Sequence, residues 1–224
     1  MRDESGALCM AKFPSREDTH DVGAWELVVH RLAAKAGINV PATRGLRLGD
    51  TGYTTFLATR FDRTDDGRRR AFVSAMTLTQ RADGERGASY LELVELLQSR
   101  GVNTDADSSE LFRRVVFSIL IHNTDDHLRN HGFFINARGI RLSPAFDINP
   151  SLQRDNLTLA INETETTCDV SIALAAHRDY GLSLQDAEAI VRQVRDAVGT
   201  WRTEAERMKV PRAERELMAA AFQA

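Results

Sequence analysis

The sequence predicts an α+β fold in which a partial, strand-rich small lobe is followed by a larger, mainly helical lobe. Short apolar and β-branched runs, separated by turn-rich segments, lie in the first part of the chain. From about residue 90 onward, apolar side chains instead recur at helical spacing. We therefore expect a small lobe over residues 1–62 and a helical lobe over residues 63–224.

The first strand is expected over residues 7–13, where Lys12 lies within an apolar run. On pattern alone, Lys12 is either an edge-strand lysine that limits aggregation or a lysine that pairs with nucleotide phosphates. A helix is expected over residues 21–36, because its apolar positions recur every three or four residues and Gly37 then ends it. Glu26, near the start of this helix, either complements the helix dipole or holds Lys12 in place.

Two further strands are expected at residues 46–48 and 53–58, joined by a hairpin turn at residues 49–52. They lead into the segment Thr59-Arg-Phe-Asp-Arg63 and then into a charged loop that contains three consecutive arginines. We interpret that run of arginines as a solvated loop rather than as a binding patch.

The second lobe is expected to be built from helices. The first two cover residues 90–100 and 109–121, and Ser108 or Ser109 begins the second. Later expected elements are a strand at residues 157–161 and helices at residues 170–177, 183–198 and 201–208. An apolar stripe near the end is interpreted as core packing rather than as a partner surface; its members are Leu217, Met218, Ala221 and Phe222.

A dense polar segment follows the second of these helices. It contains Asp125, with Asn130 five residues later, and a hairpin with its turn at residues 136–139 separates this pair from Asp147. Protein kinases use such a set: one Asp accepts the proton of the substrate hydroxyl, while an Asn five positions on and a later Asp bind magnesium. Carboxylate and amide oxygens are the hard ligands that magnesium prefers. The spacing therefore favours phosphoryl transfer.

The same residues carry a resemblance to a known family. The motif Asn123-Thr-Asp-x-His127-x-Arg-Asn130, followed by Leu142-Ser-Pro-x-Phe-Asp147, resembles the signature of HipA-type serine/threonine kinases, the toxins of bacterial toxin–antitoxin pairs. That family usually has Lys at the position of Arg129. The resemblance extends from about residue 7 to the C-terminus, and it implies a protein-kinase-like fold of the HipA type.

The resemblance also implies a role for each matching residue, with ATP and Mg²⁺ as cofactors. The catalytic base is Asp125, and the magnesium ligands are Asn130 and Asp147. The family carries its nucleotide-binding lysine in a strand that ends Lys-Phe/Leu-Pro, and this lysine corresponds to Lys12 in Lys12-Phe-Pro14. The remaining nucleotide contacts are the side chains of His127 and Phe146 and, at the adenine, the main chain of Thr59 and Phe61.

On this resemblance the chain transfers the ATP γ-phosphate to a hydroxyl of a protein, with aminoacyl-tRNA synthetases as the associated substrates and a helix-turn-helix antitoxin as a partner. In the family, a Gly- and Ser-containing phosphate loop precedes the lysine strand, whereas here only Ser5-Gly6 stands before it. Without the amides of such a loop, the γ-phosphate is poorly oriented. The alternative is therefore an impaired or split, pseudokinase-like binding module. On the resemblance, either the chain is N-terminally truncated or a separate chain supplies the missing N-terminal region.

A metal-dependent hydrolase is a third and less favoured interpretation. His127 and His131 have the i, i+4 spacing of helical zinc ligands. The residues between them are Leu-Arg-Asn, which lack the glutamate base of the zincin motif, and Arg129 adds a positive charge beside the ion.

Composition and charge argue against a nucleic-acid-binding, membrane-spanning, secreted or disulfide-rich protein. The net charge of −3 gives no electrostatic basis for direct binding of nucleic acid. No apolar run approaches the ~20 residues that span a bilayer, and the charged N-terminus does not resemble a secretory signal. The two cysteines, Cys9 and Cys168, lie among small or apolar residues and do not indicate a disulfide framework. We expect a cytoplasmic protein that does not enter a membrane.

Overall fold

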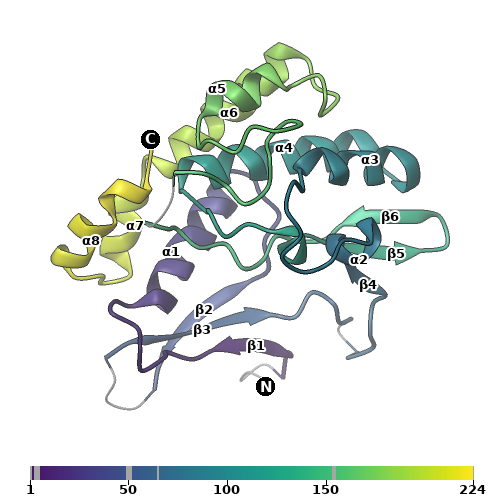
Figure 1. The fold of residues 1–224 in the computed structure, drawn as a ribbon. Helices are drawn as coiled ribbons and strands as arrows, with labels where there is room; N and C mark the ends of the chain where they lie inside the picture. Colours follow the sequence, from purple (N-terminus) through teal and green to yellow (C-terminus); the bar gives the residue numbers. More distant parts are fainter. Residues whose placement is uncertain (1, 3–5, 49–51, 65, 153–154, 224) are drawn as a thin grey trace.

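A small antiparallel sheet and one long helix form the N-terminal part of the chain (Figure 1). The structure is a computed structural model, and it describes residues 2, 6–48, 52–64, 66–152 and 155–223. The sheet has the strand order β1-β3-β2, and α1 packs against it. Its elements are β1 (Cys9–Lys12), α1 (Val22–Lys35), β2 (Thr43–Arg47) and β3 (Thr54–Thr59).

Helix α1 begins where the sequence places it and lies close to β3. The Asp21 side chain accepts hydrogen bonds from the main-chain N–H of Ala24 and of Thr54, so one carboxylate caps the helix and ties it to the strand. Gly23 permits this approach, because a Cβ there would lie 2.0 Å from the carbonyl oxygen of Thr54. The expected β2–β3 hairpin is present, but residues 49–51 of its turn lie outside the described residues.

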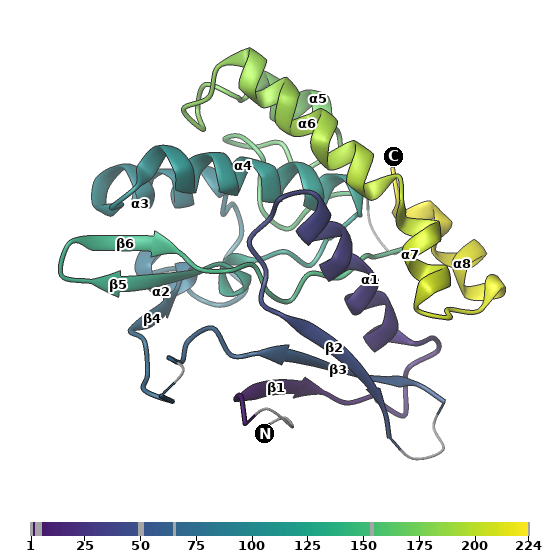
Figure 2. The ribbon, with the colours of Figure 1, turned by 180° about the vertical axis from the view of Figure 1, so that it is seen from behind.

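A second antiparallel sheet, of order β4-β5-β6, lies beside the helical part of the chain (Figure 2). The hairpin with its turn at residues 136–139 is present in register, with Asn136 opposite Gly139. The elements of this region are β4 (Phe72–Ser74), α2 (Ala75–Thr79), a 3₁₀ turn (Leu128–Asn130), β5 (Gly132–Asn136) and β6 (Gly139–Leu142).

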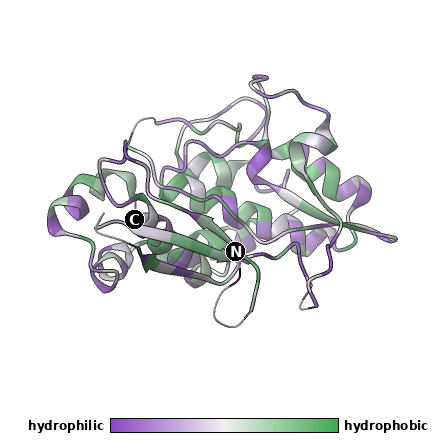
Figure 3. Ribbon diagram, turned by 90° about the horizontal axis from the view of Figure 1, so that it is seen from below, coloured by the Kyte–Doolittle hydropathy of each residue, from purple (hydrophilic) through white to green (hydrophobic). Residues whose placement is uncertain are grey.

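Helices form most of the remaining structure and enclose the core. In Figure 3 the hydrophobic stretches lie in the centrally packed elements, and the hydrophilic ones follow the outer loops. Helix α1 packs against α6 and α7 as well as against β3, and its buried side belongs to the same hydrophobic core as the later helices. The helices are α3 (Tyr90–Arg100), α4 (Thr104–Leu120), α5 (Val170–Ala175), α6 (Leu184–Val198), α7 (Trp201–Arg207) and α8 (Arg212–Met218), followed by a 3₁₀ turn (Ala219–Ala221).

The predicted start of α4 was wrong, because the helix begins at Thr104, ahead of the predicted 109. The polar residues that suggested a loop belong to its first turns. The Asp107 carboxylate is buried there, accepting hydrogen bonds from the Arg141 side chain at 2.8 Å and from the Leu142 main-chain N–H at 3.1 Å. Tertiary partners on β6 thus outweigh the low helix propensity of this stretch.

The predicted strand at residues 157–161 was also wrong. Its apolar side chains are buried, but the backbone there forms no strand in the described structure: Ala160 makes an isolated bridge to Ser89, and Leu157 and Ile161 donate hydrogen bonds to the nearby loop. The C-terminal stripe packs largely as expected, since Phe222 stacks on Trp201 at 4.6 Å between ring centroids, although Leu217 is 55% exposed.

The α+β fold class, with a small strand-rich part and a larger helical part, is confirmed. The exact boundary between residues 62 and 63 stays a prediction. No helix in the described ranges combines the length and the apolarity needed to cross a membrane.

Candidate active site

Lys12 connects the two parts of the candidate site. It is the last residue of β1, and its Nζ lies 2.7 Å from Glu26 Oε1 on α1 and 2.5 Å from Asp147 Oδ1. Glu26 is only 2% exposed, whereas Lys12 and Asp147 are 41% and 44% exposed at the side chain. The contacts therefore support the interpretation in which Glu26 holds Lys12 in place, and not the one in which it only complements the helix dipole.

Burial and charge shift the pKa values of Lys12 and Glu26 in opposite directions. Burial disfavours the charged form of Lys12, but the carboxylates of Glu26 and Asp147 outweigh it, so the pKa of the lysine is raised. Burial also raises the pKa of Glu26, from an ordinary 4.5 to about 7, and the positive charge of Lys12 only partly offsets this effect. The charge that holds Lys12 in place is thus itself sensitive to pH near neutrality.

This shift predicts a pH-dependent difference between the wild type and Glu26→Gln. Because the folded chain binds the Glu26 proton more tightly than the unfolded chain does, this group favours folding most below pH 4.5, and its contribution falls as the pH rises to about 7. At ~1.4 kcal/mol per pKa unit, the fall is on the order of 3 kcal/mol. Urea unfolding at pH 5 and pH 8 should show this fall in the wild type and not in Glu26→Gln. The exposed Glu163→Gln variant should behave as the wild type, and an unchanged fall in Glu26→Gln would contradict the assignment.

Asp147 lies in an unusual backbone conformation. Its φ is +57°, in the left-handed region that non-glycine residues seldom adopt. Its Oδ1 accepts a hydrogen bond from Lys12 and a longer one, 3.4 Å, from Asn149 Nδ2. Backbone strain of this kind persists where the surroundings over-determine it, and it concentrates at functional sites.

Asp125 and Asn130 lie in the loop that follows α4. The Asp125 side chain is exposed, while the Asn130 Nδ2 donates to the main-chain oxygen of Asp125 at 3.3 Å. The loop that carries Asp147 is attached to this one, because the main-chain N–H of Asn149 donates to Asn123 Oδ1 at 3.4 Å. The structure therefore brings the two predicted loops side by side.

Beneath Asp125, the next residue anchors the loop to the core. Asp126 is 4% exposed, and its Oδ2 accepts hydrogen bonds from the Tyr90 hydroxyl at 2.7 Å and the Ser118 hydroxyl at 3.2 Å. Its Oδ1 lies 2.9 Å from His131 Nε2. Burial raises the pKa of the Asp126 carboxyl, but His131 and the hydroxyl donors outweigh burial and lower it overall. Adjacent aspartates thus have opposite environments, one buried and one facing solvent.

A cavity of about 360 Å³ extends from Lys12 to the segment that follows β3. Of the predicted nucleotide contacts, it brings together Lys12, Thr59, Phe61, Phe146 and Asp147. The Phe61 ring lies 5.6 Å from that of Phe146, which joins the linking segment to the loop of Asp147. Two charged residues that line it, Arg60 and Asp62, pair with each other.

The residues predicted to hold magnesium have suitable chemistry. The Nδ2 of Asn130 is engaged by the main chain of Asp125, which leaves its amide oxygen for another partner. Near Asp147, the Oδ1 of Asn149 is buried without a hydrogen-bond partner among the described residues. A carboxylate and two amide oxygens on adjoining loops are ligands of the hard type that magnesium takes. Sequence reasoning assigned no role to Asn149.

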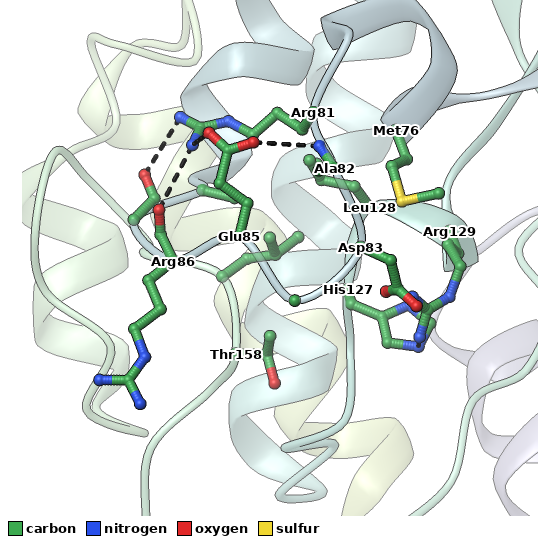
Figure 4. Close-up of a pocket in the computed structure, with 14 residues that line it drawn as sticks. Met76, Arg81, Ala82, Asp83, Glu85, Arg86, His127, Leu128, Arg129 and Thr158 are labelled. Carbon is green, nitrogen blue, oxygen red and sulfur yellow. Dashed lines mark hydrogen bonds and ion pairs between the residues drawn. The ribbon is translucent and has the colours of Figure 1, made fainter.

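His127 lies elsewhere, in a second cavity of about 270 Å³ (Figure 4). Its Nε2 is 3.0 Å from Arg129 Nη2, and Arg129 also pairs with Asp83. On the opposite wall Arg81 binds Glu85. The structure does not bring His127 together with Lys12 and Asp147, so its assignment to the nucleotide stays a prediction without geometric support.

The zinc interpretation does not agree with the placement of the histidines. The helical turn between them spans only Leu128–Asn130, and His131 turns into the core toward Asp126. Among the residues that the structure describes, no three His, Cys, Asp or Glu side chains are grouped to hold a metal ion.

Comparison with known families agrees with this geometry. The family model described as the HipA-like C-terminal domain matches residues 1–201. The chain belongs to this family. Two curated relatives carry kinase names: "Putative kinase" of Haemophilus influenzae, 27% identical over 146 residues, and "Putative kinase Y4dM" of Sinorhizobium fredii, 26% identical over 226 residues. The alignments cover 60% and 93% of this chain but only 43% and 54% of the relatives, so the chain spans about half of their length.

Solved structures show the same fold. HipA of Shewanella oneidensis, in a complex with HipB and operator DNA, has a TM-score of 0.76 at 20% identity, covering 95% of this chain and 55% of that one. The proinflammatory kinase CtkA of Helicobacter pylori has a TM-score of 0.55 at 12% identity, covering 91% of both chains. These likenesses confirm the kinase-like fold of the HipA type that the sequence predicts.

Proposed function

We propose that this chain is a serine/threonine protein kinase that transfers the γ-phosphate of ATP to a protein hydroxyl. The observation that carries the proposal is the position of Lys12, which pairs with the buried Glu26 and with Asp147. These three residues line the same cavity as the segment Thr59–Phe61. Kinases need a fixed cation for the phosphates and an acidic group beside it for the metal.

In this proposal each residue has one task. Lys12 binds the phosphates of the nucleotide, while the base lies between Phe146 and the main chain of Thr59 and Phe61. Asn130 and Asp147 hold Mg²⁺, which when bound neutralises phosphate charge. Asp125 accepts the proton of the attacking hydroxyl as its oxygen bonds to the γ-phosphorus and the bond from phosphorus to the ADP oxygen breaks.

The proposed partners rest on a structural relative. Shewanella HipA is seen with HipB and operator DNA. We propose that this chain likewise has a helix-turn-helix antitoxin as partner, touches DNA only through it, and acts in the cytoplasm as a toxin on a protein substrate such as an aminoacyl-tRNA synthetase. Co-purification of the tagged chain with the product of the adjoining gene tests the partner, and recovery of the tagged chain alone would contradict it.

Calorimetric titration of ATP, with and without magnesium, tests the site. The wild type should bind ATP more tightly with magnesium, and Asp147→Ala should lose most of that magnesium effect because it removes a carboxylate ligand. The matched control is Asp66→Ala, which removes an exposed carboxylate that contacts Thr64 and Arg68. An equal magnesium effect in wild type and Asp147→Ala would exclude the ligand assignment. Bound Mg-ATP without phosphate transfer to any protein would favour the binding-module alternative.

A further inference from the structure

His30 is a buried histidine that lines the cavity proposed for the nucleotide. It lies on α1, one turn after Glu26, and is 2% exposed. Its ring packs 5.1 Å from that of Phe56, and it is among the residues that line the cavity. Neither ring nitrogen has a hydrogen-bond partner in the described structure.

Such a side chain is costly unless something else binds it. A buried polar atom left without a hydrogen bond costs about 1–3 kcal/mol, and most such atoms in folded proteins are satisfied. An apolar residue of similar size would fill the same space on α1 without this cost. The polar group is therefore better explained by a partner that enters the cavity.

The protonation state of His30 limits what that partner is. Burial, reinforced by the positive charge of Lys12, lowers the pKa of His30 from 6.5 to about 4. The ring is thus neutral at physiological pH, with one nitrogen that donates and one that accepts. The charged residues nearby have other tasks in the proposed function: Glu26 holds Lys12, Lys12 binds the phosphates, and Asp147 binds magnesium.

We propose that His30 forms a polar subsite for the purine base, hydrogen-bonding the edge that carries N7 and the 6-amino group. The inference rests on the proposed function and names a specificity residue within that site. It places the base between the main chain of Thr59 and Phe61 on one side and the α1 wall on the other, with Lys12 at the phosphates. That edge of adenine presents one acceptor and one donor, so either nitrogen of a neutral imidazole has a match there.

The test combines a side-chain change with an atom change in the ligand. Calorimetry compares Mg-ATP with 7-deaza-ATP, which lacks N7, and with purine riboside triphosphate, which lacks the 6-amino group. The wild type should bind one analogue about tenfold more weakly than ATP, as expected for the loss of a buried hydrogen bond. His30→Leu should bind ATP about tenfold more weakly and should show no further loss with that analogue. Met10→Leu, which changes another lining residue without altering hydrogen bonding, should keep the wild-type discrimination.

A stability measurement excludes a purely structural role. Without ligand, His30→Leu should melt at the same temperature as the wild type or higher, since it removes an unpaired polar group. Two results would overturn the His30 proposal while leaving ATP binding intact. One is a lower melting temperature of His30→Leu without ligand. The other is a loss of affinity for the analogue that is as large in His30→Leu as in the wild type. Absence of ATP binding by the wild type would instead overturn the proposed function, and this inference with it.

Discussion

Replacing Asp126 by alanine is expected to lower the free energy of unfolding by about 3–5 kcal/mol, the range for removing one partner from a buried charged network. The change deletes the acceptor shared by the hydroxyls of Tyr90 and Ser118 and removes the carboxylate beside His131. These groups are buried and cannot turn to solvent. Urea denaturation followed by circular dichroism measures the effect.

The neighbouring residue supplies a matched control. Asp125→Ala removes the same kind of side chain one position away, but from an exposed site, so its effect on unfolding should stay within about 0.5 kcal/mol. Tyr90→Phe removes one donor of the network and should cost about 1–2 kcal/mol. Equal losses from Asp125→Ala and Asp126→Ala would show that the network does not stabilise the loop.

The two aspartates also mark the limit of what the sequence predicts here. A loop has no periodicity, so nothing in the pattern says which of two adjacent carboxylates is buried. The family resemblance selected Asp125, but it gave no reason for Asp126 or for its partner Tyr90, which lies 36 positions earlier in the chain. Contacts between side chains so far apart depend on tertiary packing, which local pattern does not encode.

Other features followed from local chemistry and were predictable. The hairpin between β5 and β6, the cap of α6 at Ser183 and the full extent of α3 match the turn, capping and periodicity signals. The start of α4 did not follow, because the polar residues after Thr104 read locally as a loop. His30 also went unnoticed, since in an amphipathic helix one histidine among apolar residues becomes significant only when a cavity is seen beside it.

The largest effect on activity is expected from Asp125→Asn. A positioned general base contributes about 10²–10⁴-fold to a reaction, and an amide cannot accept the proton of the substrate hydroxyl. The substitution should leave the loop unchanged, because Asn130 bonds to the main-chain oxygen of Asp125 and not to its side chain. We therefore expect the rate of phosphate transfer to fall by this factor while the affinity for Mg-ATP changes less than about twofold.

The measurement is transfer of radiolabelled phosphate from ATP to proteins of a cell lysate, with ATP affinity determined by calorimetry on the same preparations. Asp83→Asn is the matched control, since it also neutralises an exposed aspartate near this loop, the partner of Arg129. It should retain the rate of the wild type within about twofold, as expected for loss of an exposed ion pair. A full rate in Asp125→Asn would show that another group accepts the proton. An equal loss in Asp83→Asn would show instead that the local charge around the loop, and not a base at Asp125, sets the rate.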